Sequence, residues 1–332
     1  MDSPDKRGDT FMLEVNGLVK HFPVPGKRKS VVHAVDDVTF AIRKGETLGL
    51  VGESGCGKST VARTVARMYK PTAGKIILDS HDISTLNGRE LRPFRKKMQM
   101  VFQDPYSSLN PRMTVLSLVA EPLIAQGIVD TARAARDQVV QILTEVGLSA
   151  EHCSRYPHEF SGGQRQRISL ARALVLGPEL VICDEPISAL DVSIQAQVIN
   201  LLQRFKQEQE LTYLFIAHDL SMVRYVSDTV GVMYLGKMVE ICDSEEIYRN
   251  PLHPYTRGLL AAIPVPDPGA AKERTRSVAI RGDLPSPISP PRGCRFHTRC
   301  KEVMDICRRV EPPLQTKEGD HKVACHLYGS LQ

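Results

Sequence analysis

Short apolar runs alternate with amphipathic segments along most of the chain. The apolar runs have the length and content of buried strands and occupy residues 47–51, 75–78, 98–102, 180–183, 213–217 and 229–233. Segments with helical periodicity lie between several of them, at residues 131–147, 164–175 and 193–208. Continuous apolar strands that alternate with helices are typical of a parallel sheet covered on both faces. The pattern therefore predicts an α/β fold with a mostly parallel sheet.

Two stretches depart from this alternation and indicate domain limits. Residues from about 106 to 176 have no convincing strand pattern, so we expect a helical subdomain there. Residues 262–292 contain seven prolines and predict an extended linker, because proline disfavours helix at its own position and at the one before it. The expected organisation is a main domain at residues 11–261, this linker, and a small C-terminal module at residues 293–332.

Composition and charge narrow the classes of function. The 332 residues are 42% hydrophobic and 24% charged, which is ordinary for a globular protein. No apolar stretch approaches the ~18 residues of a membrane-spanning helix, and the N-terminal segment is too charged for a signal peptide. We therefore expect a chain that is cytosolic or lies on the cytosolic face of a membrane. The net charge of +5, without a concentrated basic stripe, argues against a nucleic-acid partner.

One glycine-rich segment has the spacing of a phosphate-binding loop. The apolar run 47–51 is followed by Gly52-Glu53-Ser54-Gly55-Cys56-Gly57-Lys58-Ser59-Thr60, which fits G-x-x-x-x-G-K-[ST] between a strand and a helix. In such a loop, backbone N–H groups at a helix N-terminus surround a phosphate. Lys58 would reach the β- and γ-phosphates of ATP, and the Ser59 hydroxyl would bind Mg²⁺. Cys56 is expected only to be small enough for the loop, and a chance match in a glycine-rich turn is the alternative.

Two carboxylates follow another apolar run. Asp184 and Glu185 come directly after residues 180–183, at the carboxyl end of a predicted strand, where ligands of open α/β sheets bind. Asp184 would support Mg²⁺, and Glu185 would polarise the attacking water as a general base. Two acids after an apolar run are equally typical of a solvated strand end, but the phosphate loop in the same chain favours nucleotide hydrolysis.

Further motifs give a resemblance to the ATP-binding cassette (ABC) ATPases. The string Ser161-Gly162-Gly163-Gln164 is similar to the signature of that family, and other family motifs are present in the family's order. They are an aromatic residue for adenine stacking (Phe22), the glutamine of the Q-loop (Gln103), the aspartate of the D-loop (Asp191) and the switch histidine (His218). The resemblance implies an ABC-type P-loop core with an antiparallel β subdomain and a helical subdomain. For Phe22, a place in the core is the alternative.

The same resemblance implies how the motifs act. In the family, two cassettes pair head to tail, and each ATP lies between the phosphate loop of one cassette and the signature of the other. Residues 161–164 would thus complete the ATP site of a partner. The other implied roles are holding the γ-phosphate and Glu185 in register (His218), connection of the two sites (Asp191), and Mg²⁺ binding together with coupling of the γ-phosphate state to the helical subdomain (Gln103).

Four longer segments are similar to the ATPases of oligopeptide and dipeptide importers. They are residues 101–112, 156–160, 250–256 and 282–287, and the form Tyr-Ser-Ser-Leu-Asn-Pro-Arg is most similar to the second ATPase subunit of such systems. The resemblance implies a peripheral subunit on the cytoplasmic face of the cell membrane. Its partners would be another ATPase subunit in a heterodimer, two transmembrane permeases and, indirectly, an extracytoplasmic substrate-binding protein. Importers of nickel, glutathione or glycosides are alternatives to peptide importers.

Four of the eight cysteines gather near the C-terminus: Cys294, Cys300, Cys307 and Cys325. Four thiols in a segment too short to form its own core predict a metal-stapled module. Five and six residues separate the first three, whereas zinc sites favour pairs separated by two to four. The resemblance to peptide importers implies a [4Fe–4S] cluster, with zinc or metal-free cysteines as alternatives. The nearby His297, His321 and His326 are expected at the surface rather than as ligands.

Two other classes of function explain less of the sequence. A soluble ABC ATPase of translation would fuse two cassettes, and one of DNA repair would carry a long coiled coil; neither pattern is visible. A redox- or metal-sensing module with an incidental ATPase would not need the full set of Lys58, Asp184, Glu185 and His218. The sequence therefore favours the ATP-hydrolysing subunit of a peptide importer.

Overall fold

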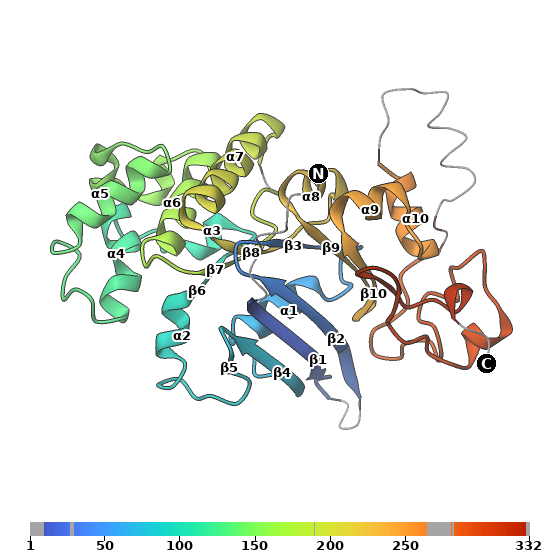
Figure 1. Cartoon of the computed structure of the whole chain (residues 1–332). Coiled ribbons are helices and arrows are strands. Elements are labelled where there is room, and N and C mark those ends of the chain that lie inside the picture. Colours follow the sequence, from blue (N-terminus) through green and yellow to red (C-terminus); the bar gives the residue numbers. More distant parts are fainter. Residues whose placement is uncertain (1–9, 27–29, 189, 264–279, 281, 330–332) are drawn as a thin grey trace. The chain divides into compact units, whose positions relative to one another are not determined.

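The computed structural model describes the chain except residues 1–9, 27–29, 189, 264–279, 281 and 330–332. The chain divides into two compact units (Figure 1). The first comprises Met1–Leu13, Ala41–Glu46 and Ile77–Leu214, and the second comprises Glu14–Phe40, Thr47–Ile76 and Phe215–Gln332. Because the chain crosses between them several times, each unit combines segments that are far apart in the sequence.

The second unit contains the strand that leads into the phosphate loop. Strand β3 (Thr47–Val51) pairs in parallel with β9 (Thr229–Tyr234), and β9 pairs antiparallel with β10 (Lys237–Asp243). All five residues of β3 are buried, as in a strand covered on both faces. A Cβ on Gly49 would lie 2.4 Å from Val223 Cγ1, so this glycine lets helix α8 (Leu220–Val226) pack directly on β3.

The end of the chain joins the same sheet. Strand β12 (His321–Val323) pairs antiparallel with β10, and β11 (Gln315–Glu318) pairs antiparallel with β12. The strand order in this unit is therefore β11-β12-β10-β9-β3. Helices α9 (Ser244–Arg249) and α10 (Pro254–Ala261) follow β10, and the one-turn helices η3 (Asp305–Arg308) and η4 (His326–Tyr328) flank the hairpin. Residues 264–279 and 281 of the expected linker at residues 262–292 lie outside the described residues.

A buried carboxylate organises the region between β10, β12 and α10. Glu240 on β10 is fully buried and accepts the N–H groups of Leu252 at 2.6 Å and His253 at 2.9 Å. The Nε2 atom of His321 lies 2.8 Å from Glu240 Oε1, and His321 is only 6% exposed. The expectation that His321 lies at the surface is therefore wrong, because a buried carboxylate needs this polar partner.

A second, four-stranded sheet has the order β2-β1-β4-β5. Its strands are β1 (Phe11–Pro23), β2 (Val31–Arg43), β4 (Ala73–Leu78) and β5 (His81–Asp82). Gly74, with a left-handed φ of 88°, lies against the backbone of β1, since a Cβ there would be 2.2 Å from the carbonyl oxygen of Gly17. The mixed α/β architecture agrees with the predicted fold class.

The first unit carries a short parallel pair of strands and most of the helices. Strand β6 (Met98–Val101) pairs in parallel with β7 (Leu180–Asp184). Strand β8 (Thr212–Ile216) is divided between the two units, at Leu214 and Phe215. The described residues 102–179 form helices and turns without a strand. The helices of this unit are α2 (Arg92–Lys97), α3 (Pro105–Ser108), α4 (Val115–Ala125), α5 (Arg136–Glu145), η1 (Ala150–Ser154), η2 (Pro157–Glu159), α6 (Gly162–Leu174) and α7 (Val192–Gln209). In Figure 1, α4, α5 and α6 gather into one helical group.

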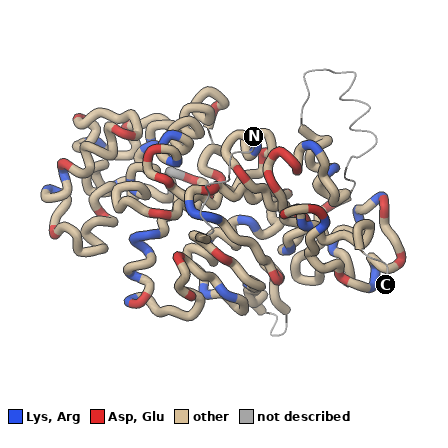
Figure 2. The backbone as a smooth tube through the Cα atoms, viewed as in Figure 1, with Lys and Arg blue, Asp and Glu red and all other residues tan. Residues whose placement is uncertain are grey.

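Charged residues of both signs are mixed along the described parts of the chain. Basic and acidic residues are interspersed along the described backbone of each unit (Figure 2), in keeping with a net charge of only +5. Among the described residues, no helix combines the length and apolar character that crossing a membrane requires.

Burial of His253 predicts a pH-dependent stability. Burial lowers the pKa of His253 from 6.5 to about 4, so between these values the unfolded chain binds a proton that the folded chain does not. The free energy of unfolding should therefore fall as the pH drops from about 6.5 to about 4, by up to about 3 kcal/mol from this residue.

Urea unfolding at several pH values measures this effect. His253 Nδ1 accepts the N–H of Tyr255 at 3.0 Å and so caps α10. The variant His253→Asn keeps a capping side chain but removes the titrating group, so its stability should depend less on pH. An equal pH dependence in the two proteins would contradict the lowered pKa.

Candidate functional site

The phosphate loop joins β3 to helix α1 (Lys58–Val65) in the second unit. Gly52 and Gly57 have left-handed φ values of 148° and 111°. A Cβ on Gly52 would lie 2.2 Å from the carbonyl oxygen of Met233, and one on Gly57 would lie 2.2 Å from that of Ala34. Only glycine fits at both positions, so the predicted motif has the backbone cradle that a phosphate needs at a helix N-terminus. Ser54 and Gly55 are exposed, and Ser59 and Thr60 lie in the first turn of α1.

Lys58 closes the phosphate loop on itself. Its side chain is buried, and its Nζ donates to the carbonyl oxygens of Gly52 at 2.7 Å and Glu53 at 3.2 Å. Cys56 is also buried, and its carbonyl oxygen accepts the N–H of Gly236 at 2.7 Å. Burial raises the pKa of the Cys56 thiol, which keeps it protonated and agrees with a packing role.

The predicted carboxylates end strand β7 in the first unit. Asp184, the last residue of β7, is fully buried. Glu185 has a left-handed φ of 49°, an unfavourable conformation for a residue with a Cβ. Its carbonyl oxygen accepts hydrogen bonds from the N–H of Ser188 at 3.3 Å and from the Ser188 hydroxyl at 3.1 Å. Strain of this kind is characteristic of functional sites, where it fixes the direction of a side chain.

The structure brings Gln103 and Glu185 together within the first unit. Gln103 follows β6, and its Nε2 donates to Glu185 Oε2 at 2.7 Å. Because β6 and β7 are parallel neighbours, both side chains leave the same edge of the sheet. The residue expected to sense the γ-phosphate thus contacts the expected general base directly.

The signature string begins helix α6 with a reciprocal cap. The Ser161 hydroxyl accepts the N–H of Gln164 at 3.3 Å, and Gln164 Oε1 accepts the N–H of Ser161 at 3.1 Å. A Cβ on Gly163 would lie 2.6 Å from Ile194 Cγ2 on α7, so packing requires this glycine. A Cβ on Gly162 would lie 3.7 Å from the Leu190 side chain, an ordinary contact. Packing in the described residues therefore accounts for Gly163 but not for Gly162.

Two arginines of α6 hold the segment that follows Gln103. The Arg165 guanidinium lies 4.0 Å from the centre of the Tyr106 ring, and its Nε donates to the Pro157 carbonyl oxygen at 2.7 Å. Arg172 Nη1 donates to the carbonyl oxygen of Ser108 at 3.0 Å. The sequence motifs did not predict a role for either arginine, although their place on the helix that follows the signature string was a usable signal. They connect the signature helix to α3.

The remaining predicted positions occupy separate places. Asp191 precedes α7, where Gln195 Nε2 donates to the carbonyl oxygens of Ile187 at 3.1 Å and Leu190 at 3.0 Å; Ala189 of the same motif lies outside the described residues. His218 is exposed and lies two residues after the end of β8. The Phe22 ring on β1 is half-buried, with the Tyr69 ring at 5.2 Å and Lys20 Nζ at 4.8 Å from its centre. The adenine contact of Phe22 stays a prediction.

The four C-terminal cysteines lie near one another in the second unit. Burial, together with the neighbouring thiols of Cys307, Cys325 and Cys300, raises the pKa of Cys294 to about 12. Burial also raises the pKa of Cys325, to about 11. The N–H of Cys294 donates to the Cys307 carbonyl oxygen at 2.8 Å, and a Cβ on Gly293 would lie 2.4 Å from that oxygen. Metals bind the thiolate form of cysteine, so a metal bound here would stabilise the deprotonated thiols that burial disfavours.

Two nearby histidines contact backbone rather than thiols. His297 Nδ1 lies 2.8 Å from the Cys294 carbonyl oxygen, and His326 Nε2 lies 2.9 Å from that of Val310. Both side chains are intermediate in exposure.

Comparison with known proteins identifies the family. Residues 35–188 match the ABC transporter model, and residues 239–307 match the C-terminal region of oligopeptide/dipeptide transporters. The chain is 55% identical over 321 residues to the putative oligopeptide transport ATP-binding protein YkfD of Bacillus subtilis, with 97% of each chain covered. It belongs to the oligopeptide-transport ATP-binding proteins of the ABC family. It is 53% identical over 322 residues to AppF of the same organism, an oligopeptide transport ATP-binding protein, covering 96% of this chain and 97% of AppF.

Solved structures support the same family fold. The dimeric structure of the ATP-binding cassette MJ0796 in a post-hydrolysis state, bound to ADP and Pi, matches with a TM-score of 0.64 and 27% identity, over 70% of this chain and 99% of MJ0796. The structure of cbiO1 of Clostridium perfringens, part of the ABC transporter complex cbiONQ, matches with a TM-score of 0.62 and 25% identity, over 73% of this chain and 92% of cbiO1. The predicted ABC cassette fold and the predicted ATPase class are confirmed.

The two signature glycines should respond differently to alanine. Gly163→Ala should lower the free energy of unfolding by about 1–3 kcal/mol, because its methyl would overlap Ile194 in a packed contact. Gly162→Ala is the matched control and should change it by less than about 1 kcal/mol, because its methyl meets only an ordinary contact. Urea unfolding measures both; equal losses would contradict the packing role of Gly163.

Proposed function

We propose that the chain is the ATP-binding and ATP-hydrolysing subunit that powers the import of di- or oligopeptides through a membrane ABC transporter. The observation that carries this proposal is the match of residues 239–307 to the C-terminal region of oligopeptide/dipeptide transporters. The names of YkfD and AppF, which refer to oligopeptide transport, support it over a nickel, glutathione or glycoside importer. A soluble, non-transport ABC ATPase would not need this C-terminal region.

The phosphate loop and the strand-end carboxylates carry the proposed chemistry. Lys58 and the loop N–H groups bind the β- and γ-phosphates, and Ser59, Gln103 and Asp184 hold Mg²⁺. Bound Mg²⁺ supplies positive charge that stabilises the transferring phosphoryl group. Glu185 polarises the attacking water, and its contact with Gln103 at 2.7 Å supports a base whose position depends on the γ-phosphate.

Further residues complete the proposed ATP sites. Phe22 stacks on adenine, and His218 contacts the γ-phosphate during hydrolysis. Residues 161–164 reach the ATP of a partner cassette, and Asp191 connects the two sites. The ordinary contact at Gly162 supports such a role, since packing among the described residues gives no other reason for a glycine there.

The proposed assembly is a heterodimer of ATPase subunits on the cytoplasmic face of the cell membrane. This chain is its second ATPase subunit, attached peripherally to two transmembrane permeases, with an extracytoplasmic substrate-binding protein on the far side. The segment 101–112, which follows β6 and is held by α6, supports a coupling path from Gln103 to the permeases.

The proposed domain organisation ends in a cofactor module. A cassette at residues 11–261, with its helical subdomain at about 106–176, is followed by a linker at residues 262–292 and a module at residues 293–332.

The proposed ligands of a [4Fe–4S] cluster in this module are Cys294, Cys300, Cys307 and Cys325. Besides burial, the other three thiols raise the pKa of Cys294, an effect that requires the thiols to lie near one another. This proximity supports the cluster, which needs four thiolates together.

Replacing the proposed base tests the ATPase mechanism. Glu185→Gln should lower ATP turnover by a factor on the order of 10²–10⁴, the usual contribution of a general base, and leave ATP binding intact. Glutamine keeps an oxygen that can accept the hydrogen bond from Gln103. A phosphate-release assay and a nucleotide titration give the two numbers. Unchanged turnover in Glu185→Gln would exclude this residue as the base.

Replacing the loop lysine tests the binding role. Lys58→Ala should instead weaken ATP binding, since Lys58 also holds the loop carbonyls.

Metal analysis tests the cysteine module. Protein purified without oxygen should contain about four irons and four acid-labile sulfides per chain, and Cys300→Ser should lose both. The matched control is Cys242→Ser, which changes a buried thiol on β10 outside the proposed ligand set and should keep the iron. Zinc, or no metal, in the wild-type protein would contradict the cluster without affecting the ATPase proposal.

A further inference from the structure

A carboxylate lies inside the phosphate loop and is paired with the C-terminal region. Glu53 follows the first loop glycine, and its two carboxylate oxygens accept hydrogen bonds from Arg299 Nη1 at 2.7 Å and Nη2 at 3.0 Å. The Arg299 side chain is only 8% exposed, whereas that of Glu53 is 27% exposed. A two-pronged, largely buried pair of this kind is stronger and more directional than a surface ion pair.

The position of Glu53 in the phosphate loop gives this pairing an electrostatic consequence for anion binding. A negative charge in a loop that receives phosphates repels the ligand, and the repulsion is large where water is scarce. Lys58 Nζ, which is expected to reach the phosphates, lies 3.2 Å from the carbonyl oxygen of Glu53 itself. The guanidinium of Arg299 therefore neutralises the negative charge of Glu53, which would otherwise repel the phosphates that Lys58 attracts.

A second contact fixes the backbone of the loop at the same residue. The N–H of Glu53 donates to the Tyr255 hydroxyl at 2.8 Å. The Tyr255 ring packs against Tyr234 at 4.7 Å and Phe296 at 5.3 Å between ring centres. Phe296 is 3% exposed and lies three residues before Arg299, so the same segment that supplies the guanidinium also supports the tyrosine.

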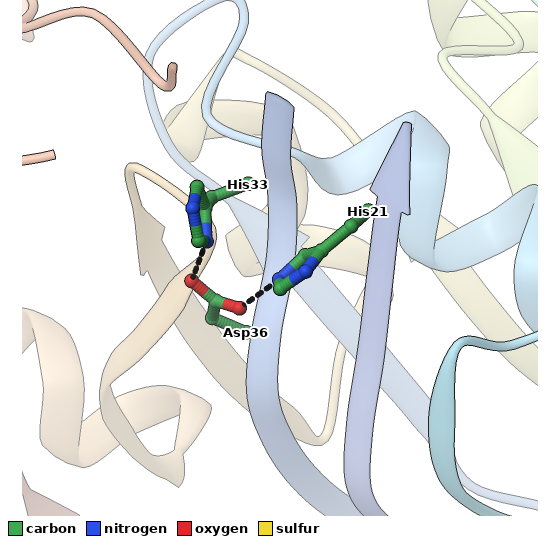
Figure 3. Close-up of side chains that lie close together, drawn as sticks. All are labelled: His21, His33 and Asp36. Atoms are coloured by element: carbon green, nitrogen blue, oxygen red, sulfur yellow. Dashed lines mark hydrogen bonds and ion pairs between the residues drawn. The ribbon is translucent and has the colours of Figure 1, made fainter. Parts of the chain in front are cut away.

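The other end of this segment is anchored beside β1 and β2. Arg295 donates to a carboxylate oxygen of Asp36 and to the carbonyl oxygen of Leu235. Figure 3 shows Asp36 between His21 and His33, with His33 Nδ1 at 3.1 Å from Asp36 Oδ2. Burial would raise the pKa of Asp36, but hydrogen bonds from His21 and Arg295 lower it overall. Ligand atoms of the three residues in Figure 3 lie within 4.8 Å of one another, but the adjacent guanidinium disfavours a metal cation there.

We propose that Arg299 is a positioning residue of the ATP site, which neutralises Glu53 and holds the phosphate loop in its anion-binding form. The segment 294–300, bounded by two cysteines, is thereby part of the ATP site rather than a separate appendage. This inference rests on the proposed ATPase function and adds a residue that the sequence motifs do not include.

A double-mutant cycle tests the neutralisation. The variants are Arg299→Gln, Glu53→Gln and the combination of the two, and the readout is the dissociation constant of MgATP by nucleotide titration. Arg299→Gln should weaken MgATP binding at least about tenfold, because Glu53 is left charged beside the phosphates. Glu53→Gln should bind MgATP as tightly as the wild type or more tightly. The double variant should recover to within about threefold of the wild type, a rescue that a merely structural arginine would not give.

Two further variants keep the cycle interpretable. Arg257→Gln breaks another ion pair of the C-terminal region, Arg257 to Glu302 at 3.1 Å, and should leave the MgATP affinity unchanged. Arg299→Lys keeps the positive charge and should stay within about threefold of the wild type. If Arg299→Gln fails to fold, an affinity of Arg299→Lys that falls tenfold overturns the proposal.

The outcomes separate this inference from the proposed function. If the wild-type chain binds and hydrolyses ATP but Arg299→Gln binds MgATP with unchanged affinity, the role of Arg299 is wrong and the ATPase proposal stands. Loss of affinity without recovery in the double variant also overturns the neutralisation. If the wild-type chain itself neither binds nor hydrolyses ATP, the proposed function fails before the cycle is reached.

Discussion

The close approach of the phosphate-loop backbone to its neighbours is the constraint on which the second unit depends. Carbonyl oxygens of Met233 and Ala34 occupy the space that side chains at positions 52 and 57 would need. The loop can keep this form only while the strands that carry those carbonyls stay in register. Lys58 then ties the loop to its own carbonyls, so the anion site is formed before any nucleotide arrives.

In the first unit, helix α6 has the corresponding role. Its first turn is capped by the signature residues, Gly163 sets its distance from α7, and its arginines hold the segments around Tyr106 and Ser108. A shift of α6 would therefore be transmitted to the chain that follows Gln103. The left-handed backbone of Glu185 adds local strain at the residue that Gln103 contacts.

The sequence predicted those features that local pattern and motif spacing determine. The apolar runs became β3, β4, β6, β7, β8 and β9, and the helical patterns became α5, α6 and α7, because apolar runs and helical periodicity are both visible in the local sequence. The long strands β1 and β2 were not recognised individually, since their buried and exposed positions are mixed. The glycine-rich loop was placed correctly between a strand and a helix, because its function requires that local geometry.

Pairings between distant residues could not be predicted from one sequence. Glu53 and Arg299 are 246 positions apart, and neither is unusual among its neighbours. His321 was placed wrongly at the surface because it follows Glu318, Gly319 and Asp320, which are typical of an exposed turn. Its buried partner, Glu240, lies on a strand 81 positions earlier. Such contacts depend on topology, which local periodicity does not encode.

The pairing of β12 with β10 also affects the order in which the protein can be completed. Strand β10 has five consecutive buried residues, and without β12 its outer backbone groups would form an open sheet edge. An open apolar edge can pair with strands of other chains. During synthesis from the N-terminus, this edge stays uncovered until residues 321–323 have emerged. The nascent chain must therefore protect β10 from aggregation for the time that about eighty residues take to be made.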